Sequence, residues 1–460
     1  MRSFPRGLSL KAHKEISEHK PIKMASTPKK VILPLQQNLG CAAEPLLKIG
    51  ESVIEGQKIA DSPKLVSAPI HASISGKITA IEKLPNPCGF DVTSIVIEAE
   101  AQLTPEMRYE SRWSVEELTP EQIRKIVREA GIVGLGGATF PTHVKITPPP
   151  GKKIEVLIIN GCECEPYITA DHRIMLEKPA EVVLGARALA KAAGAAKIYF
   201  GIEDNKKDAI DKIKSAINDH PAAFPMEVIE LKTKYPQGGE RQLIKAVLRR
   251  EVPSGGLPLD IGVVVNNVGT ALAVAEAVKF GIPLFKRVVT VTGSGVKDPQ
   301  NLLVRLGTPF AEVIDQCGGL VADPAKVIMG GPMTGLAVSS LDLPVVKATN
   351  CILVMDKKEA KTYQEYDCFR CGRCIQVCPI NLMPNFICES IKLRNWEKAE
   401  EYHVADCIEC GCCAYVCPRR IYLVQYFKAA KKELSRLAGS RNTLNSDNKE
   451  AGQLRKAVCQ

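Results

Sequence analysis

Short β-type segments separated by turn residues fill the chain from Val31 to about Glu100. Apolar runs such as Val31-Ile-Leu-Pro-Leu and Val92-Thr-Ser-Ile-Val-Ile alternate with stretches rich in Gly and Pro. Closely spaced short strands with turn signals between them are typical of a small barrel or sandwich. We therefore predict a barrel-sandwich β domain over residues 31–105. Residues 1–30 show no such pattern, and we expect them to be irregular.

A different pattern, in which strands alternate with helices, runs from residue 115 to residue 285. The predicted strands are Glu155–Asn160, Ile198–Gly201, Met226–Leu231 and Ile261–Asn266. The predicted helices lie around residues 179–193, 205–217, 239–249 and 270–279. Such alternation predicts a mainly parallel sheet that is covered by helices on both faces. The fold expected for this segment is a Rossmann-like α/β core.

Three further segments complete a multidomain α/β architecture. Residues 286–350 follow the order strand, turn, strand and helix, which is the order of a small β-grasp-like module. Residues 360–427 hold most of the cysteines, and we expect a helical domain there. A basic tail, 428–460, ends the chain.

Length and composition are those of a globular protein with several domains. The 460 residues exceed one ordinary domain, and the apolar fraction of 45% and charged fraction of 24% are unexceptional. Aromatic residues make up only 5% of the chain. This scarcity argues against a surface that stacks on bases, so we expect no nucleic-acid partner.

The formal net charge is +10, and part of it lies at the two ends. Residues 1–30 carry eight Lys or Arg against two Glu, and residues 428–460 carry eight against three acids. Such ends are usually just solvated; the alternative is electrostatic attachment to an anionic membrane or an acidic partner. Because no stretch approaches about 18 apolar residues and the N-terminus lacks the apolar core of a secretory signal, we expect neither a membrane span nor export.

Two copies of one cysteine motif give the strongest chemical signal. Each copy has the spacing Cys-x2-Cys-x2-Cys-x3-Cys-Pro, and the second follows the first by 39 residues. In this spacing three thiolates bind one [4Fe–4S] cluster and the fourth Cys binds the other cluster. The expected ligands are Cys368, Cys371, Cys374 and Cys417 for cluster 1, and Cys407, Cys410, Cys413 and Cys378 for cluster 2.

A pair of zinc sites is the competing interpretation, because zinc sites also use Cys-x2-Cys steps. Zinc has no use for a third Cys at the same spacing or for the Cys-Pro pairs, which favours iron–sulfur clusters. Seventeen Cys in a chain without an export signal also favour metal binding in a reducing compartment over disulfides. The Cys expected not to bind metal are Cys41, Cys88, Cys162, Cys164, Cys317, Cys351, Cys388, Cys412 and Cys459.

A Gly-rich loop, Gly134-Leu-Gly136-Gly137-Ala-Thr-Phe140, follows a predicted helix at 120–131. Glycines let backbone N–H groups approach a phosphate or a flavin ring closely. The loop is not the strand–turn–helix motif of dinucleotide-binding proteins, because a helix precedes it. Taken alone, the loop is weak evidence for a ligand site, and a plain structural turn would be the favoured interpretation.

Three polar motifs lie at or near predicted strand ends, where open α/β sheets bind ligands. They are Asn160-Gly-Cys-Glu163-Cys-Glu165-Pro, Tyr235-Pro-Gln-Gly-Gly-Glu240 and Asn266-Asn267-Val-Gly-Thr270. Asn side chains at such an edge can hydrogen-bond the carbonyl and N–H groups of a flavin. The alternatives are helix capping for the Asn pair and a solvated acidic turn for the two Glu.

These four motifs, in this order, resemble the NADH- and FMN-binding core of the flavoprotein subunit of respiratory complex I, and the β-grasp-like module, of SLBB type, fits the same resemblance. Together with the barrel before the core and the cysteine quartets after it, the chain resembles the C subunits of Rnf complexes. Those complexes are membrane-bound ferredoxin:NAD oxidoreductases coupled to ion transport. The resemblance covers about residues 30–427.

The resemblance implies non-covalent FMN, NAD(H) and two [4Fe–4S] clusters as cofactors, with no side chain acting as a catalytic acid, base or nucleophile. The residues implied to contact the flavin or its phosphate are Gly134, Gly136, Gly137, Lys145, Asn160, Asn266, Asn267 and Thr270. Those implied on the nicotinamide and ribose side are Phe140, Glu165 and Glu240, with Glu163 as a further cofactor-binding candidate. Leu135 and Gly239 depart from the complex I pattern, which has Arg and Glu there.

The implied activity is hydride exchange between NADH and FMN, followed by relay of single electrons through the clusters. The implied partners are the other subunits of a membrane-bound electron-transport complex, including a ferredoxin-like subunit, and the implied location is the cytoplasmic face of the membrane as a peripheral protein. Two alternatives stay open: a flavo-iron–sulfur protein of cobalamin reductase type, and a pure electron relay without nucleotide binding.

Overall fold

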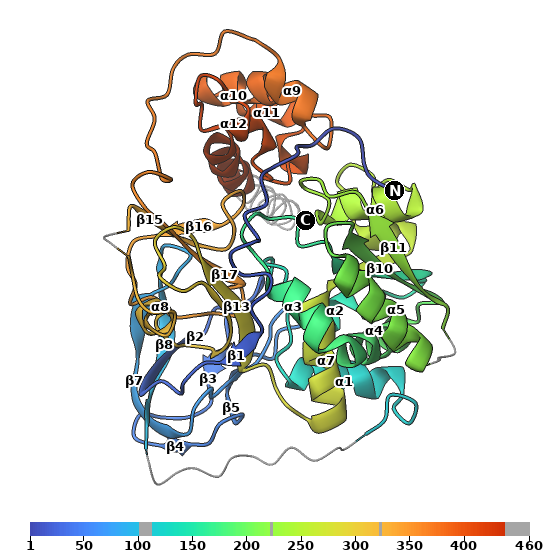
Figure 1. Ribbon diagram of the computed structural model, residues 1–460, viewed down its shortest axis with the longest axis vertical. Helices are drawn as coiled ribbons and strands as arrows, with labels where there is room; N and C mark the ends of the chain where they lie inside the picture. Colours follow the sequence, from blue (N-terminus) through green and yellow to red (C-terminus); the bar gives the residue numbers. More distant parts are fainter. Residues whose placement is uncertain (101–112, 221–223, 322–323, 438–460) are drawn as a thin grey trace, which may run out of the picture. The chain divides into compact units, whose positions relative to one another are not determined.

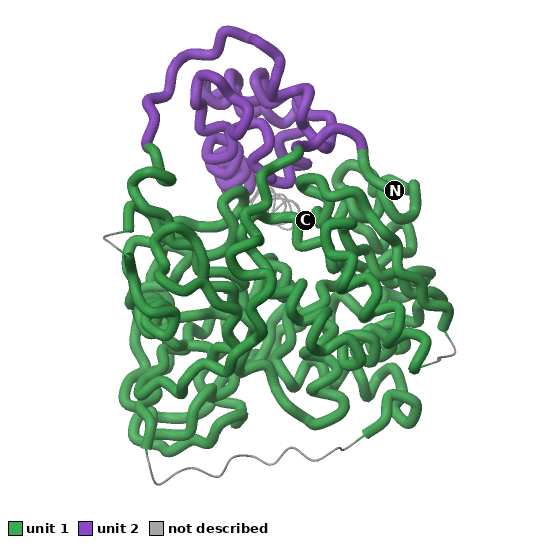
Figure 2. Tube along the Cα trace, viewed as in Figure 1, with its two compact units in different colours: residues 1–4, 9–361 green, residues 5–8, 362–460 purple. Residues whose placement is uncertain are grey.

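The computed structural model describes residues 1–100, 113–220, 224–321 and 324–437 (Figure 1). The chain forms two compact units (Figure 2). The larger unit contains residues 1–4 and 9–361, and the smaller contains residues 5–8 and the chain from Thr362 onward. The end of the predicted β domain (101–105), most of the predicted tail (438–460) and Cys459 lie outside the described residues.

A four-stranded parallel sheet forms the centre of the α/β core. Its spatial order is β11 (Met226–Leu231), β10 (Lys197–Glu203), β9 (Val156–Gly161) and β12 (Val263–Asn267). Alternate side chains of β9 point to opposite faces: Leu157 and Ile159 share a core with one set of helices, and Val156 and Ile158 with another. The first set is α4 (Pro179–Ala193), α5 (Lys207–Asp219) and α7 (Val268–Phe280), and the second is α6 (Glu240–Leu248). Both faces are covered, as the alternation predicts.

The order in which strands are added to the sheet reverses between β9 and β12. Strands β10 and β11 follow on one side of β9, whereas β12 lies on its other side. The register of the ladder pairs Asn160, near the end of β9, with Asn267, at the end of β12. Open α/β sheets bind ligands outside the carboxyl ends of strands at such a switch point. The remaining helices of the core are α1 (Pro120–Glu129), α2 (Thr142–Lys145), α3 (Ala170–Glu177) and the 3-10 turn η1 (Pro258–Ile261).

The predicted β domain consists of two small antiparallel sheets. One has the order β2 (Lys30–Pro34), β8 (Asp91–Ala99), β7 (Gly76–Pro85) and β4 (Ser52–Val53), and the other β3 (Glu44–Pro45), β5 (Lys58–Asp61) and β6 (Ile70–His71). Alternate residues of β2, Val31 and Leu33, are fully buried against Ile95 and Ile97 of β8. The apolar residues that alternate in the sequence are therefore those that point into the sandwich.

A six-stranded mixed sheet packs on the same core as the sandwich. Its order is β1 (Ile22–Met24), β14 (Gln300–Arg305), β13 (Lys286–Thr292), β17 (Cys351–Met355), β15 (Lys326–Met329) and β16 (Leu336–Val338). Helix α8 (Phe310–Asp315) lies between β14 and β15 in the chain. Val289, Val291 and Phe310 belong to one apolar cluster with the sandwich strands.

The expectation that residues 1–30 are irregular is wrong in part. Strand β1 pairs in parallel with the edge of β14, and Lys14 and Ser17 are buried. Three residues are too few for an alternating pattern to be visible in a sequence. The strand forms because the edge of β14 presents backbone groups that need partners.

Two buried cations tie the modules of the larger unit together. Lys347 Nζ donates to the carbonyl oxygens of Pro69 (2.8 Å), in the sandwich, and Gly131 (2.7 Å), just before the Gly-rich loop. Arg287 on β13 donates to the Leu135 carbonyl inside that loop (3.2 Å). Burial lowers the pKa of Lys347 to about 7 and that of Arg287 to about 10. These contacts anchor the start of the loop to two neighbouring modules.

The smaller unit is helical, as expected from its sequence. Its helices are α9 (Arg373–Val377), α10 (Pro384–Lys392), α11 (Trp396–Glu401), the 3-10 turn η2 (Val404–Asp406), α12 (Cys412–Tyr415) and a helix through residues 423–437. Ile387, Val404 and Phe427 form the centre of its core. In the part of the chain that the structure describes, no helix combines the length and apolarity needed to cross a membrane.

Gly185 sets how closely α4 approaches α7. A Cβ at this position would lie 1.8 Å from the Ala271 carbonyl oxygen, which is a backbone atom and cannot step aside. Gly185→Ala would ordinarily favour a helix, but here we expect it to destabilise the larger unit by about 2 kcal/mol or more. The measurement is thermal unfolding of the full chain, with an expected midpoint decrease of about 4–8 °C.

The matched control is Glu181→Ala on the same helix. Glu181 makes only a loose surface ion pair with Lys178 (3.8 Å), so its loss should change the midpoint by about 1 °C or less. Equal midpoints for the two variants would show that α4 and α7 are not held at the close spacing described.

Candidate functional site

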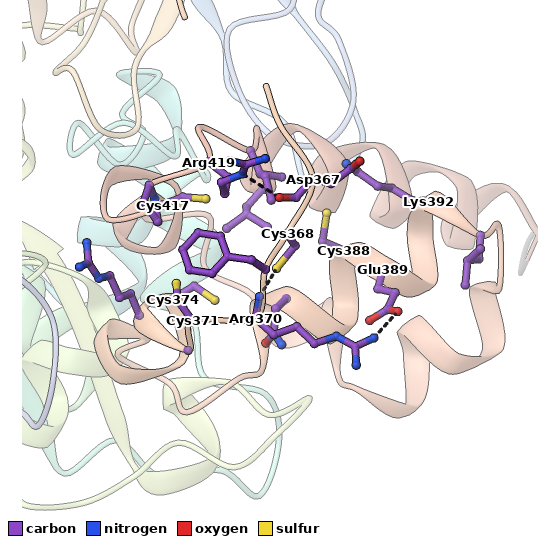
Figure 3. A pocket seen from close by; sticks show the side chains of 18 residues that line it. Asp367, Cys368, Arg370, Cys371, Cys374, Cys388, Glu389, Lys392, Cys417 and Arg419 are labelled. Carbon is purple, nitrogen blue, oxygen red and sulfur yellow. Dashed lines mark hydrogen bonds and ion pairs between the residues drawn. The ribbon is translucent and has the colours of Figure 1, made fainter. Parts of the chain in front are cut away.

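Two pockets of the smaller unit are lined by cysteine thiols. The first is lined by Cys368, Cys371, Cys374 and Cys417, together with Cys388 (Figure 3). The second is lined by Cys407, Cys410, Cys413 and Cys378, together with Cys412. Each pocket thus combines three thiols of one quartet with the fourth thiol of the other. We call this arrangement crossed, and it is the one that the cysteine spacing predicts. Which thiols bind each cluster stays a prediction.

The two cysteine loops have the same backbone conformation. Residues 39 apart share left-handed φ angles: 58° at Arg370 and 56° at Glu409, and 75° at Gly372 and 80° at Gly411. The loops also present backbone N–H groups to sulfur, with Arg370 N donating to Cys368 Sγ and Glu409 N to Cys407 Sγ, both at 3.4 Å. Such donors stabilise thiolates. The sequence repeat is therefore also a structural repeat.

The donor set of each pocket fits a cubane cluster. Four thiols of the two quartets line each pocket beside a fifth Cys, and burial raises the pKa of Cys378 and brings that of Cys407 to about 11. Thiols of this kind become thiolates when a metal replaces the proton. Among the described residues, no three His, Cys, Asp or Glu side chains meet at a position suited to a single metal ion.

The Gly-rich loop is a tight turn with an open outer side. Gly134 N donates to the Phe140 carbonyl (2.9 Å), and Thr139 N donates back to the Gly134 carbonyl (3.1 Å). Gly137 has a φ of +113°, and a Cβ built there would meet no heavy atom within 4 Å. Leu135 N donates to Thr270 Oγ1 (2.9 Å), which ties the loop to the first turn of α7. The backbone around Gly137 is thus accessible to a flat or anionic group.

The three Asn side chains at the strand ends differ in their hydrogen-bond partners. Asn267 Oδ1 accepts from Gly269 N (2.8 Å) and caps α7, so the capping interpretation is confirmed for this residue. Asn160 Nδ2 donates to the Gly238 carbonyl (2.8 Å) and holds the Tyr235–Glu240 motif against β9. Asn266 is buried, and its Nδ2 has no hydrogen-bond partner. A buried amide without an acceptor is costly unless a ligand supplies one.

The side chain of Glu163 is only 3% exposed and structural, which corrects its interpretation as part of a solvated acidic turn. Its carboxylate accepts from the backbone N–H groups of Asp171 (2.6 Å) and His172 (3.3 Å) at the start of α3. Lys14 Nζ lies 3.8 Å away. Burial raises the pKa of Glu163 to about 7. Its predicted contact with a cofactor stays a prediction.

Glu165 is partly exposed, but its carboxylate is held by backbone groups of a distant turn, so the solvated-turn interpretation is wrong here too. Its carboxylate accepts from the backbone N–H groups of Met333 (3.1 Å) and Thr334 (2.9 Å). Burial raises its pKa. Glu165 therefore joins the strand-end motif to the turn between β15 and β16, and its predicted contact with the NADH ribose or adenine stays a prediction.

Lys145 and Glu240 form an ion pair at 2.7 Å between α2 and α6. Both side chains are partly exposed, at 31% and 40%. The structure thus brings together the residue predicted to neutralise the FMN and one predicted to bind NADH. Phe140 is half-buried at the end of the Gly-rich loop.

Lys14 is a site residue that the sequence did not reveal. Its Nζ donates to the carbonyl oxygens of Glu165 (3.1 Å) and Ile168, beneath the acidic motif. A single Lys in a basic N-terminal segment carries no signal that distinguishes it from its neighbours. Only the folded chain shows that it supports the loop.

Four family models match the chain in the order of its modules. They are the RnfC barrel sandwich hybrid domain (residues 2–102), the Nuo51 FMN-binding domain (127–276), the SLBB domain (288–337) and the 4Fe-4S dicluster domain (360–418). One relative is the C subunit of the Na(+)-translocating ferredoxin:NAD(+) oxidoreductase complex of Acetobacterium woodii. It is 44% identical over 86% of this chain and 89% of its own. The chain belongs to the RnfC family.

Other comparisons add to this finding. The C subunit of the proton-translocating ferredoxin:NAD(+) oxidoreductase complex of Clostridium ljungdahlii is 45% identical over 84% of each chain. Among solved structures, an NAD+-reducing [NiFe]-hydrogenase matches 72% of this chain and 65% of its own with a TM-score of 0.47 and 20% identity. Membership of the RnfC family displaces the cobalamin reductase alternative.

The Gly-rich loop and the strand ends fit FMN, the cofactor that this family's flavin domain implies. The unpartnered Asn266 Nδ2 offers a buried donor, and the backbone at Gly137 is open to close approach. Donors of this kind match the carbonyl edge and phosphate of a flavin.

The crossed cysteine grouping can be tested with pairs of substitutions. If Cys378 and Cys407 bind the same cluster, the double variant Cys378→Ala, Cys407→Ala should keep about four of eight irons, no fewer than either single variant. The pair Cys368→Ala, Cys378→Ala should lose both clusters. Iron content after anaerobic purification, with electron paramagnetic resonance of the reduced protein, is the measurement. The opposite result for the two pairs would show that each quartet binds its own cluster.

Proposed function

We propose that this chain is the NAD(H)-reacting flavo-iron–sulfur subunit of a membrane-bound ferredoxin:NAD oxidoreductase complex coupled to ion translocation. Family membership and the presence of an FMN-binding domain and a dicluster domain in one chain support this function. The decisive observation is the combination of a strand-end site for a flavin with two four-thiol pockets. Each part supplies one half of the conversion between a two-electron and a one-electron carrier.

When bound, FMN accepts a hydride from NADH and passes on single electrons, which [4Fe–4S] clusters can carry. The chain's own residues provide positions for this chemistry. Asn266 would donate to the flavin ring, and the backbone of Gly136 and Gly137 would lie against it. Lys145 would leave its partner Glu240 to approach the phosphate, which frees Glu240 for the ribose of NADH. Glu163 and Glu165 would keep the strand-end motif in shape.

The proposal also covers the fold of two modules, the location of the chain and its partners. The module over residues 286–350 would be β-grasp-like, and the α/β core would be Rossmann-like. The chain would lie on the cytoplasmic face of the membrane as a peripheral subunit. Its partners would be the other subunits of the complex, including a ferredoxin-like one, and the basic ends would contribute attraction to that surface.

The first test is spectroscopy of the anaerobically purified chain. We expect about eight irons and one FMN per chain, and loss of the visible flavin and cluster absorbance on addition of NADH but not of NADPH. Eight irons without flavin, and no response to NADH, would reduce the chain to an electron relay. Flavin without iron would contradict the cluster assignment.

A second test concerns the buried amide. Asn266→Leu keeps the branched shape of the side chain but removes the donor, so FMN affinity should fall about tenfold, the value of one hydrogen bond, while the iron content stays unchanged. Fluorescence titration of the flavin-depleted chain with FMN measures this affinity.

The control is Thr292→Val. Thr292 is a fully buried residue of β13, and its Oγ1 also has no hydrogen-bond partner. Its replacement therefore removes a comparable polar atom at a position far in sequence from the ends of β9 and β12. FMN affinity should not change. An unchanged affinity in Asn266→Leu would remove Asn266 from the flavin site.

A further inference from the structure

The two halves of the cysteine unit share a backbone but differ in charge. Arg370, Arg373 and Arg419 line the first pocket, and Arg420 lines an adjoining groove that also contains Cys417. We refer to these four residues as the arginine rim. Their counterparts 39 residues away are Glu409, Cys412, Ile380 and Asn381. Among the described residues that line the second pocket, none is Lys or Arg.

The second pocket shows that the four arginines of the first are not needed to bind a cluster. Both pockets offer four thiols, so both clusters would carry the same charge. The second pocket is the more enclosed, since Cys410 and Cys413 are buried whereas Cys368 and Cys371 are exposed. A buried anion needs compensating cations more than an exposed one does. The second pocket has a cation close by, since Lys431 Nζ donates to the Cys407 carbonyl and pairs with Glu409 at 2.8 Å. Charge compensation alone therefore does not explain why four arginines border the first pocket.

Exposed aromatic side chains gather around the arginine rim. Of the seven aromatic residues that are exposed in the described part of the chain, five lie between Tyr363 and Tyr422. Phe369 lines the first pocket and is 61% exposed. The guanidinium of Arg419 lies 4.8 Å from the ring of Tyr366, and that of Arg420 lies 4.2 Å from the ring of Tyr363. Arg and aromatic residues are the types enriched in protein–protein interfaces.

Few acids offset these charges. Asp367 and Glu389 line the same pocket, and Glu389 pairs with Arg370 at 2.9 Å (Figure 3). Lys392, also on the lining, pairs with Glu365 at 2.7 Å. Arg373 and Arg420 are exposed. The outer side of the first pocket is thus positively charged and rich in aromatic residues.

We propose that the arginine rim is the docking surface for an electron-carrying protein with an acidic surface, which exchanges single electrons with cluster 1. The proposal rests on the two-cluster function proposed above and adds which cluster faces the partner. One electron moves in each encounter: the partner's redox centre loses it as cluster 1 gains it, or the reverse, and no bond or proton is transferred.

An anionic membrane would also attract arginines. The rim, however, surrounds the exposed thiols of Cys368 and Cys371, and only a redox partner makes use of access to a cluster. Exposed cations around a redox centre raise the rate of encounter without binding tightly, which suits a carrier that must leave again. The observations therefore favour a protein partner.

The test measures electron transfer from the full chain, carrying both clusters and flavin, to two acceptors of opposite charge. The chain is reduced with dithionite and freed of excess reductant, so the result does not depend on a reaction with NADH. In a stopped-flow instrument it is mixed with an acidic blue-copper plastocyanin or a basic c-type cytochrome. The charge-reversed variant is Arg373→Glu, Arg420→Glu.

We expect this variant to reduce plastocyanin about tenfold more slowly and the cytochrome faster, with the plastocyanin difference shrinking as salt is added. The matched control, Lys428→Glu, Lys432→Glu, makes the same change of charge at exposed residues of the same unit outside both pocket linings. It should leave both rates within about twofold. Iron content is measured for every variant.

Three results would overturn the proposal. Equal slowing in the control would show a general effect of net charge, and unchanged rates in both variants would show that electrons leave elsewhere. Loss of binding to vesicles containing phosphatidylglycerol, with both electron-transfer rates unchanged, would assign the rim to a membrane. If charge reversal lowers the iron content, Arg373→Gln, Arg420→Gln replaces it, with a smaller expected slowing of plastocyanin reduction and no slowing of cytochrome reduction.

Discussion

The pairing of Asn160 with Asn267 across β9 and β12 determines where the proposed cofactor site of the larger unit lies. This register brings two strand ends to one level, and the second of them leads directly into α7. Asn267 caps that helix, and Thr270 in its first turn accepts from the Gly-rich loop. The loop, the buried amide of Asn266 and the helix start are therefore positioned together. A shift of one residue in the ladder would turn every side chain of β12 to the opposite face of the sheet.

The smaller unit depends on a different constraint, the exchange of one cysteine between two loops. Because each pocket takes its fourth thiol from the other half, neither half offers a complete ligand set alone. With the predicted ligands, the two clusters would be coupled through the chain that binds them, and metal binding and folding of this unit would depend on each other. The two sites lie close together because each quartet is short and lends its fourth Cys to the other. An electron relay requires such closeness.

Much of this could be predicted from the sequence because its signals are local. The strand–helix alternation revealed the parallel sheet, and the cysteine spacing indicated the crossed pockets. The contacts that hold the carboxylates of Glu163 and Glu165 were not predictable, because their partners come from α3 and from the turn after β15. Lys14 and β1 were missed for the same reason: their partners lie in distant parts of the chain. Close contacts such as Gly185 with Ala271 depend on how two helices pack, which periodicity alone does not specify.

The pairing of β1 with β14 has a consequence for how the protein is made. Residues 22–24 are synthesised well before residues 301–303 and have no strand partner until those residues have been made. Lys14 likewise waits for Glu165 and Ile168. Contacts of such long sequence separation form late and slowly. Strand β1 therefore stays without its partner until β14 has been made, and its pairing with the sheet edge belongs to the late steps in the assembly of the larger unit.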